Sequence, residues 1–225
     1  MLRIGVMVSG GGTNLQAVID RIESGYIKNC VIVTVISSKP GIFALKRAER
    51  HNIPSACISR KSYRTLEEYD DALIAHLKDY NVDLVVMAGY LSIVGEKFIN
   101  EFSSRIINVH PSLIPAFCGK GYYGIIPHIK ALEYGVRVTG ATAHFVTLEP
   151  DAGPIILQKA VHVEEDDTPE ILQKRVMQEA EWEILPEAIK LFSEGRLVIE
   201  GRKVRTDKNK CKKPENKEDR ISGER

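Results

Sequence analysis

The sequence predicts an α/β fold in which a Rossmann-like, mostly parallel sheet is flanked by helices. Short runs rich in β-branched residues alternate with longer segments whose apolar residues recur at helical spacing, a pattern typical of parallel strands joined by helices. A glycine-rich turn, GGGT at 10–13, separates the first such run from the first helical segment. The C-terminal half changes to longer extended runs, which indicate antiparallel strands.

The N-terminal half is predicted to alternate strand and helix from its first residues. Its strands are expected at 3–8, 30–37, 55–58, 84–88 and 105–109, where apolar runs are short. Its helices are expected at 14–24, 41–51, 66–80 and 96–102, where apolar residues recur every three or four positions. Because strand and helix alternate, neighbouring strands of this half should run parallel.

The C-terminal half is predicted to add antiparallel strands and a long helix. Extended runs at 138–146 and 155–163 are expected to pair as antiparallel neighbours. A helix should begin after Thr168, because this capping residue precedes Pro169 and Glu170, and it should reach about residue 193. Residues 197–205, interrupted at Glu200 and Gly201, are expected to form a small hairpin.

The charge distribution separates one domain from a tail. The chain has 225 residues, a length that suits one domain over residues 1–206. Of its 31 basic and 30 acidic residues, ten basic and five acidic ones lie at 202–225, so the preceding part is slightly acidic, which opposes nucleic-acid binding. Residues 207–225 contain only Cys211 and Ile221 as strongly apolar residues, which predicts a disordered charged tail.

The N-terminus and the cysteines favour a cytoplasmic protein without a membrane partner. The apolar start, MLRIGVMV, is too short for a signal peptide, and no run approaches the ~20 apolar residues of a membrane span. Cys30, Cys57, Cys118 and Cys211 are far apart and form no CxxC pair, which favours reduced thiols over disulfides or zinc. We therefore expect no bound metal.

The glycine loop at 10–12 predicts a phosphate site. Free N–H groups at the start of a helix favour an anion and glycine permits close approach, although a plain tight turn has the same pattern. A dinucleotide motif would need glycine at Leu15 and an acid after the second strand, and a P-loop would need Gly-Lys-Ser/Thr. Neither is present, so a phosphate monoester fits best, held by Gly12 and by Thr13 and Asn14 with their side-chain donors.

A second candidate site gathers Asn108, His110 and Asp151. Asn108 and His110 alternate at the end of a predicted strand, so their side chains point the same way at the sheet edge where α/β proteins bind ligands. Asp151 lies in a loop, where an aspartate commonly caps backbone N–H groups. Beside His110 it would favour a charged imidazole, which with Asn108 could stabilise an oxyanion in acyl transfer. No serine or cysteine lies in a recognisable nucleophile motif.

Three motifs resemble one enzyme family in order and spacing. SGGGTNLQ at 9–16, NVHPSLIP at 108–115 and DAGPIILQ at 151–158 resemble the phosphoribosylglycinamide formyltransferases. The resemblance covers roughly residues 2–205 and makes 1–206 a formyltransferase domain. It implies transfer of a formyl group from the co-substrate 10-formyltetrahydrofolate to the amine of glycinamide ribonucleotide, in de novo purine biosynthesis. It also implies a monomer or homodimer.

The resemblance further implies residue roles. The ribonucleotide phosphate would be held by Gly12, Thr13 and Asn14. The folate would contact Asn108 and the segment after the fourth strand, at Leu91, Ser92, Ile93 and Val94. His110 would donate a proton, Asn108 would hold the formyl oxygen, and Asp151 would raise the basicity of His110 while the amine attacks the formyl carbon directly. The Ile114-Pro115 bond is expected to be cis.

Other functions remain as alternatives. A formyltetrahydrofolate deformylase would use the same trio with water, but that family usually has an N-terminal regulatory domain, and methionyl-tRNA formyltransferase normally adds a C-terminal tRNA-binding domain. Neither is expected here, because the first strand begins near residue 3 and only the charged tail follows residue 206. A non-enzymatic sensor of phosphorylated metabolites is an alternative of another class, in which the trio would be structural.

Several residues near these motifs receive no firm assignment. Many family members have an arginine where Leu66 aligns, and Arg64 lies two residues early. The loop at 117–124, rich in glycine and aromatic residues, fits a mobile cover and a plain surface loop equally well. Cys118 is given no role, His144 is expected to be packed or hydrogen-bonded, and His128 can line the site.

Overall fold

The first five strands form the parallel part of one sheet. The computed structural model describes residues 1–207, and in it the N-terminal apolar runs become β1 (Leu2–Val8), β2 (Cys30–Ser37), β3 (Ser55–Cys57), β4 (Leu84–Met87) and β5 (Ile106–His110). They pair in parallel in the order β3-β2-β1-β4-β5. All of β4 is buried, because helices cover both faces of this part of the sheet. The predicted parallel half is confirmed.

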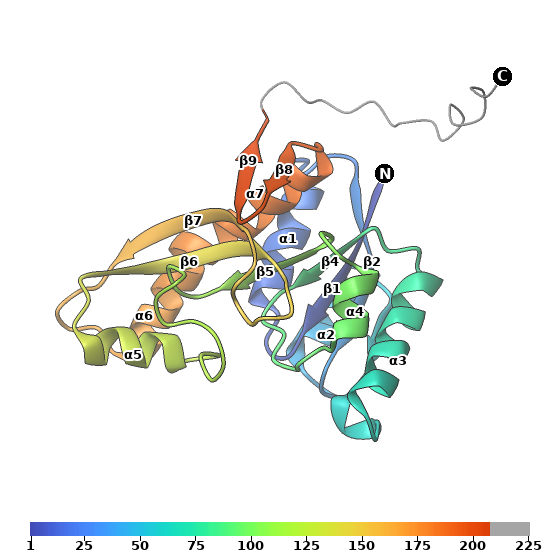
Figure 1. Ribbon diagram of the computed structural model, residues 1–225, viewed down its shortest axis with the longest axis horizontal. Coiled ribbons are helices and arrows are strands. Elements are labelled where there is room, and N and C mark those ends of the chain that lie inside the picture. The colour runs from blue at the N-terminus through green and yellow to red at the C-terminus, as the bar shows by residue number, and fades with distance from the viewer. Residues whose placement is uncertain (208–225) are drawn as a thin grey trace.

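The C-terminal strands extend the same sheet with antiparallel pairs. β6 (Val138–Phe145) runs antiparallel to β5 and to β7 (Ile155–His162), as the sequence predicts. β8 (Leu197–Glu200) and β9 (Lys203–Thr206) form the predicted antiparallel hairpin, and β9 joins β7 in parallel through the pair Ile155 and Lys203. Residues 1–207 thus contain one nine-stranded sheet, in the order β3-β2-β1-β4-β5-β6-β7-β9-β8 (Figure 1).

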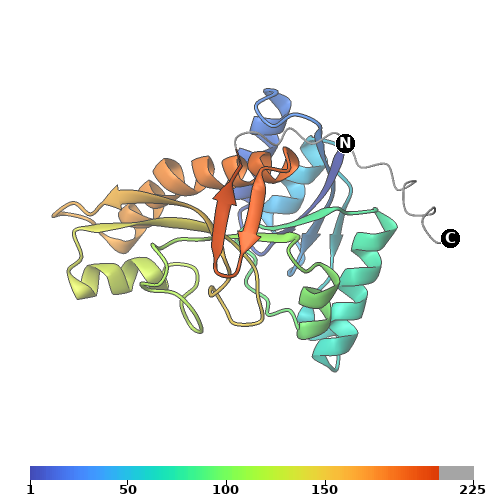
Figure 2. The same ribbon diagram turned by 45° about the horizontal axis from the view of Figure 1, so that its top comes forward.

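Helices cover both faces of the sheet (Figures 1 and 2). One apolar core joins the sheet to α1 (Thr13–Glu23), α2 (Phe43–Arg50) and α7 (Trp182–Ser193) and includes Leu15 and Leu185. The opposite core joins the sheet to α3 (Leu66–Asp79) and α4 (Glu96–Glu101) and includes Tyr69 and Phe98. Full burial of one such side chain contributes ~1.5–3 kcal/mol, so the strand ends that carry the candidate site are held firmly from both sides.

Capping residues explain where two of these helices begin. The Thr65 hydroxyl accepts the N–H of Glu68 (3.1 Å), and the Glu68 carboxylate accepts the N–H of Thr65 (3.4 Å), so a capping box starts α3. The Thr168 hydroxyl accepts the N–H of Ile171 (3.3 Å), and Pro169 is the first residue of α6 (Pro169–Val176). The predicted start of the long helix is therefore confirmed.

Two helical features differ from the prediction. Helix α5 (Ile126–Tyr134) occupies a segment without a predicted element; it has Pro127 in its first turn and ends at Gly135, whose φ is 78°. The predicted helix at 169–193 is interrupted by a π-helical turn at Met177–Glu181, after which α7 continues to Ser193. In this turn the N–H of Trp182 reaches the carbonyl of Met177, five residues earlier.

The structure also bears on three smaller predictions. The Ile114-Pro115 peptide bond is cis, as predicted. No helix within residues 1–207 is long and apolar enough to cross a membrane. Apart from Asp207, the tail predicted at 207–225 lies outside the described residues.

Candidate active site

The glycine loop leads into α1 and leaves backbone N–H groups unpaired. Gly12 precedes the helix with a left-handed φ of 72°, and its carbonyl accepts the first helical bond from Gln16 (2.9 Å). Within the described part of the chain, no hydrogen-bond acceptor meets the backbone N–H groups of Gly11, Gly12 or Thr13. Such N–H groups at the N-terminal end of a helix favour an anion.

The side chains of Thr13 and Asn14 point toward the π-helical turn. Thr13 Oγ1 donates to Sδ of Met177 (3.1 Å), and Asn14 Nδ2 donates to Oε2 of Glu181 (2.5 Å). The sequence predicts these side chains as free donors for a phosphate, but both donate to residues of the π-helical turn. Thr13 and Asn14 can therefore bind an anion only through their backbone N–H groups.

Glu181 belongs to this region and is missed by the sequence analysis. Its residue is only 8% exposed, and burial raises the pKa of its carboxyl group, although the hydrogen bond from Asn14 opposes this shift. Oδ1 of Asn14 is also buried and has no partner among residues 1–207. A buried acid with a perturbed pKa beside an anion site is a candidate functional group. The π-helical turn that aims it at Asn14 has no signal in the sequence.

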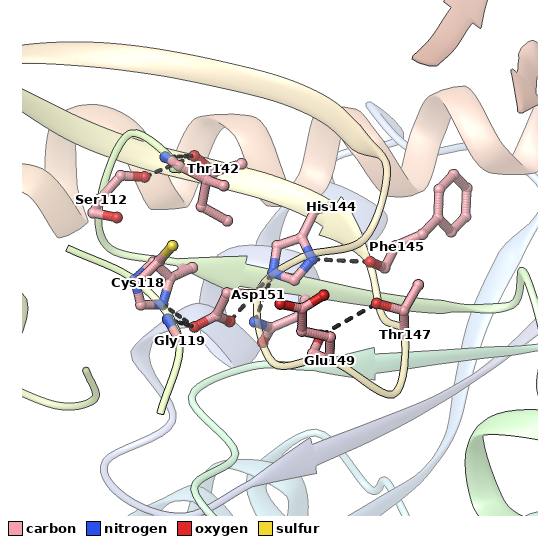
Figure 3. A network of polar contacts seen from close by, with 12 residues as sticks. Ser112, Cys118, Gly119, Thr142, His144, Phe145, Thr147, Glu149 and Asp151 are labelled. Carbon is pink, nitrogen blue, oxygen red and sulfur yellow. Dashed lines mark hydrogen bonds and ion pairs between the residues drawn. The ribbon is translucent and has the colours of Figure 1, made fainter. Parts of the chain in front are cut away.

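Asn108, His110 and Asp151 converge at the carboxyl end of β5. Asn108 pairs with His144 of β6 in the sheet, and Nε2 of His144 lies 3.7 Å from Oδ1 of Asp151, so His144 links Asn108 to the loop that His110 faces directly. Oδ2 of Asp151 lies 3.5 Å from Nδ1 of His110 and accepts the backbone N–H of Gly119 (2.9 Å). Figure 3 shows Asp151 between Gly119 and His144. Asp151 therefore both caps a backbone N–H group and adjoins the imidazole.

His110 lies between two hydrogen-bond acceptors. It is 4% exposed, and its Nε2 donates to the carbonyl of Phe117 (2.9 Å), while its Nδ1 faces the carboxylate of Asp151. A neutral imidazole has one N–H group, whereas an imidazolium has two. The two facing acceptors therefore match the two N–H groups of an imidazolium.

His144 orients the side chain of Asn108. Nδ1 of His144 donates to the carbonyl of Phe145 (2.9 Å), so its Nε2 accepts from Nδ2 of Asn108 (3.1 Å). Burial lowers the pKa of His144, although Phe145 and Asp151 oppose this shift, so the ring is neutral in this role. The second N–H group of the Asn108 amide remains available to a ligand. His144 is hydrogen-bonded, as the sequence analysis expects.

His128 of α5 is a further histidine close to the trio. It is fully buried, and neither of its ring nitrogens has a hydrogen-bond partner within residues 1–207. Burial, and to a smaller extent the charge on His110, lowers the pKa of His128 to about 4. His128 is therefore neutral, and its electrostatic interaction with His110 fits a place at the edge of the site.

The segment predicted to contact folate begins beside Asn108. Met87, the last residue of β4, pairs with Asn108 in the sheet, and four residues follow shortly after: Leu91, Ser92, Ile93 and Val94. Leu91 is 48% and Ile93 is 76% exposed, so large apolar side chains are presented at the carboxyl edge of the sheet. Arg64 is exposed and donates its backbone N–H to Glu68 at the start of α3. Exposed apolar side chains at this edge suit an aromatic ligand.

The three cysteines within residues 1–207 take no part in these contacts. Cys30, Cys57 and Cys118 are free thiols, and Sγ of Cys118 donates to the carbonyl of Pro115 (3.3 Å). Burial raises the pKa of Cys118, and the charge on Asp151 acts in the same direction, so the thiol stays protonated. Within residues 1–207, no group of three His, Cys, Asp or Glu residues could hold a metal ion.

Comparison with known proteins identifies the family. A family model described as formyl transferase matches residues 2–189. The chain belongs to the formyl transferase family. It is 42% identical over 199 residues to the phosphoribosylglycinamide formyltransferase of Haemophilus influenzae, which covers 88% of this chain and 91% of that protein. The chain also matches two longer proteins, each named trifunctional purine biosynthetic protein adenosine-3. It spans 19% of the length of the one from Gallus gallus and 14% of the length of the one from Chironomus tentans.

Solved structures share the fold over nearly the whole chain. The crystal structure of glycinamide ribonucleotide transformylase 1 from Symbiobacterium toebii superposes with a TM-score of 0.87 at 47% identity, over 92% of this chain and 94% of that one. A formyltetrahydrofolate deformylase from Pseudomonas syringae superposes with a TM-score of 0.81 at 28% identity, over 92% of this chain and 66% of that one. The formyl transferase fold is thus common to proteins of both names, and the higher identity lies with the transformylase.

Proposed function

We propose that this formyl transferase family member moves the formyl group of 10-formyltetrahydrofolate onto the amine of glycinamide ribonucleotide, a step of de novo purine biosynthesis. The observation that carries the proposal is the convergence of Asn108, His110 and Asp151 at the carboxyl end of β5. The relatives named for this activity, which are 42% and 47% identical to this chain, support it.

The two substrates would approach the trio from opposite sides of β4. Backbone N–H groups of Gly12, Thr13 and Asn14 would bind the ribonucleotide phosphate. Their loop follows β1, two strands from β5, which corresponds to ~10 Å at the usual strand spacing. The ribose and glycinamide can bridge this distance and bring the amine to Asn108. The folate would lie on the segment that begins at Leu91, with its N10 formyl group beside Asn108.

Direct transfer needs a group that stabilises the formyl oxygen. As the amine nitrogen bonds to the formyl carbon, negative charge develops on that oxygen, and the free N–H group of Asn108 would donate to it. The positive charge of His110 would stabilise the same oxygen. Since His144 holds the Asn108 amide by its other N–H group, the donor is oriented before the substrate binds.

The proton transfers balance without a covalent enzyme intermediate. When the bond between carbon and N10 breaks, N10 gains a proton from His110, and the proton that the attacking amine loses returns to the imidazole, so His110 ends the reaction as it began. We assign the donated proton to Nε2 of His110, which in this structure donates to the carbonyl of Phe117, so a ligand atom would replace that carbonyl. Asp151 would hold His110 in its charged form through Nδ1.

The proposed reaction requires no metal ion, nucleic acid or membrane. We propose that the enzyme acts in the cytoplasm as a monomer or homodimer.

A turnover assay with varied acceptors tests this function. The purified chain is mixed with 10-formyltetrahydrofolate and glycinamide ribonucleotide, and mass spectrometry follows the formylated ribonucleotide. The proposal expects product only when the ribonucleotide is present. Hydrolysis of the folate with water alone would indicate a deformylase, formylation of methionyl-tRNA would indicate the tRNA enzyme, and ribonucleotide binding without turnover would indicate a sensor.

A further inference from the structure

Helix α2 holds the glycine loop from the side opposite its free N–H groups. The carbonyl of Gly10 accepts the backbone N–H of Ala44 (3.3 Å), and the carbonyl of Gly11 accepts Nε of Arg47 (2.9 Å). Both donors come from α2. Two successive carbonyl groups of the loop are therefore bound to the same helix.

These two bonds set the direction of the loop N–H groups. In a trans peptide unit, the C=O and the N–H of the next residue point in opposite directions. Since the carbonyls of Gly10 and Gly11 point toward α2, the N–H groups of Gly11 and Gly12 point away from it, into the space in front of α1. The N–H of Thr13, at the start of the helix, points to the same space.

Packing does not hold the loop at Gly10 and Gly11, although Gly12 lies against Ala44 of α2. No heavy atom lies within 4 Å of the position that a Cβ would occupy at Gly10 or Gly11, and neither residue has a positive φ. Glycine in such open surroundings can rotate its peptide units freely. The hydrogen bonds from α2, together with the contact of Gly12 with Ala44, therefore keep the Gly11 peptide unit in its observed orientation.

The guanidinium group of Arg47 is itself held in place. Nη1 of Arg47 donates to Oε1 of Gln16 in α1 (3.0 Å), and its Cζ lies over the ring of Phe43, 4.9 Å from the ring centre. One planar cation thus joins α1, α2 and the Gly11 carbonyl. Arginine suits this task because its N–H groups point in fixed directions within one plane.

We propose that Arg47 is a positioning residue for the ribonucleotide phosphate, which it serves by turning the glycine-loop N–H groups toward the anion. The inference rests on the proposed function, which assigns the phosphate to this loop. Arg47 does not need to touch the phosphate. Its loss would leave the chemistry at Asn108 and His110 unchanged and would weaken the binding of one substrate.

The test compares Arg47→Met with Arg50→Met. Arg50 lies over the same Phe43 ring, at 5.4 Å, and has no hydrogen bond to the glycine loop, so it controls for the lost charge and the lost ring contact. In Arg47→Met we expect the Kd for glycinamide ribonucleotide, measured by calorimetry, to rise about tenfold, the scale of one lost charge-assisted hydrogen bond. The inhibition constant for inorganic phosphate should rise equally. The kcat at saturating ribonucleotide and the Kd for formyl-folate should not change.

Two outcomes would overturn the inference. One is an Arg47→Met protein that is folded, by its thermal unfolding, and binds the ribonucleotide as tightly as the wild type. The other is an Arg50→Met protein that is weakened as much. If methionine impairs folding, Arg47→Lys replaces it, with a smaller loss of affinity expected.

Gly11→Ala separates this inference from the proposed function. The added methyl group meets no protein atom within 4 Å, so it would not disturb the fold, and it would stand beside the N–H groups that are expected to bind the phosphate. A loss of ribonucleotide affinity in Gly11→Ala with none in Arg47→Met would refute only the role of Arg47. No loss in either variant would show that the phosphate binds elsewhere and would overturn both proposals.

Discussion

His110 has an unusual pair of neighbours, a carboxylate at Nδ1 and a carbonyl at Nε2. Both are acceptors, so each ring nitrogen of His110 faces a group that an N–H can bind. We predict that His110→Ala lowers turnover by ~10²-fold or more, the scale of a lost positioned acid, while calorimetry finds unchanged ribonucleotide affinity. Turnover near the wild-type rate in the folded variant would exclude His110 as the proton donor.

Asp151 supports His110 by its charge and also caps the N–H of Gly119. We predict that Asp151→Asn lowers turnover and shifts the pH–rate profile, because the charge next to His110 is lost. Asp166→Asn, at an exposed acid, is the matched control and should leave the profile unchanged. An unchanged profile in Asp151→Asn would mean that Asp151 is only a cap.

Glu181 is a residue whose burial costs stability. Burial raises its pKa above the ordinary value of 4.5, so its contribution to folding is greatest below that pH and is lost as pH rises toward the folded pKa. Gln at this position carries no charge, and its amide can donate to the unpaired Oδ1 of Asn14. We predict that Glu181→Gln raises the free energy of unfolding by about 1 kcal/mol near neutral pH, the lower end of the cost of an unpaired buried group.

Thermal unfolding at several pH values measures the effect of Glu181→Gln. The gain in Tm over the wild type should grow as pH rises above the ordinary pKa of 4.5, because only the wild type must ionise a buried acid there. Glu179→Gln, an exposed acid in the same turn, should show no such gain. A gain that does not depend on pH would contradict the role of the charge.

At the scale of elements, the sequence predicts a strand or helix correctly where its apolar residues form a clear run or a regular spacing. The strands of the parallel half were found because burial on both faces makes them continuous apolar runs, as in β4. Helix α5 was missed because Pro127 and buried His128 interrupt its apolar spacing, although Pro127 and Gly135 mark its ends. The π-helical turn at Met177–Glu181 was missed because one extra residue per turn leaves no recognisable pattern.

The loop at 117–124 is tied to the site at its start. The Phe117 carbonyl accepts from His110, and the Gly119 N–H binds Asp151, while Tyr123 is exposed. Gly119 has a φ of 89°, where a side chain costs ~1–2 kcal/mol. We predict that Gly119→Ala lowers kcat several-fold through displacement of Asp151, with little change in the Kd for ribonucleotide.

Gly201→Ala is the control for the loop variant. Gly201 has a φ of 61° in the turn between β8 and β9, and the space around it is equally open, so the backbone strain is similar. Its Tm should fall about as much as that of Gly119→Ala, and its kcat should stay at the wild-type value. Equal losses of kcat in both variants would mean that general destabilisation, and not the Asp151 contact, causes the effect.

At the scale of the whole molecule, the topology was predictable and the fine geometry of the site was not. Alternation of strand and helix was enough to predict that Asn108 and His110 lie at a sheet edge. The neutral form of His144 depends on its burial and on the Phe145 carbonyl, which only the folded chain brings together. Likewise, the engagement of Thr13 by Met177 joins residues 164 positions apart. Such long-range contacts leave no local trace in a sequence.

The two substrates are expected to bind at separate places on one sheet edge, so a lesion in the glycine loop should affect only one of them. A Cβ at Gly12 would lie 2.6 Å from Cβ of Ala44, and the φ of 72° is unfavourable for any side chain, above all a β-branched one. A side chain at Gly12 would therefore clash with α2, which lies on the side of the loop away from the expected phosphate. We predict that Gly12→Val weakens ribonucleotide binding at least about tenfold, since strain of ~1–2 kcal/mol can be relieved only by moving the loop.

The Kd for formyl-folate should be unchanged in Gly12→Val, because the segment beginning at Leu91 follows β4, and Val94 packs against the core under α3 and α4. Gly25→Val is the matched control: Gly25 has a φ of 74° beyond the end of α1, with no atom within 4 Å of its Cβ position. It should lose stability and keep both affinities. Calorimetric titration of each ligand decides the matter. Equal weakening of both ligands in Gly12→Val would mean a damaged fold, and no weakening of either would place the phosphate away from this loop.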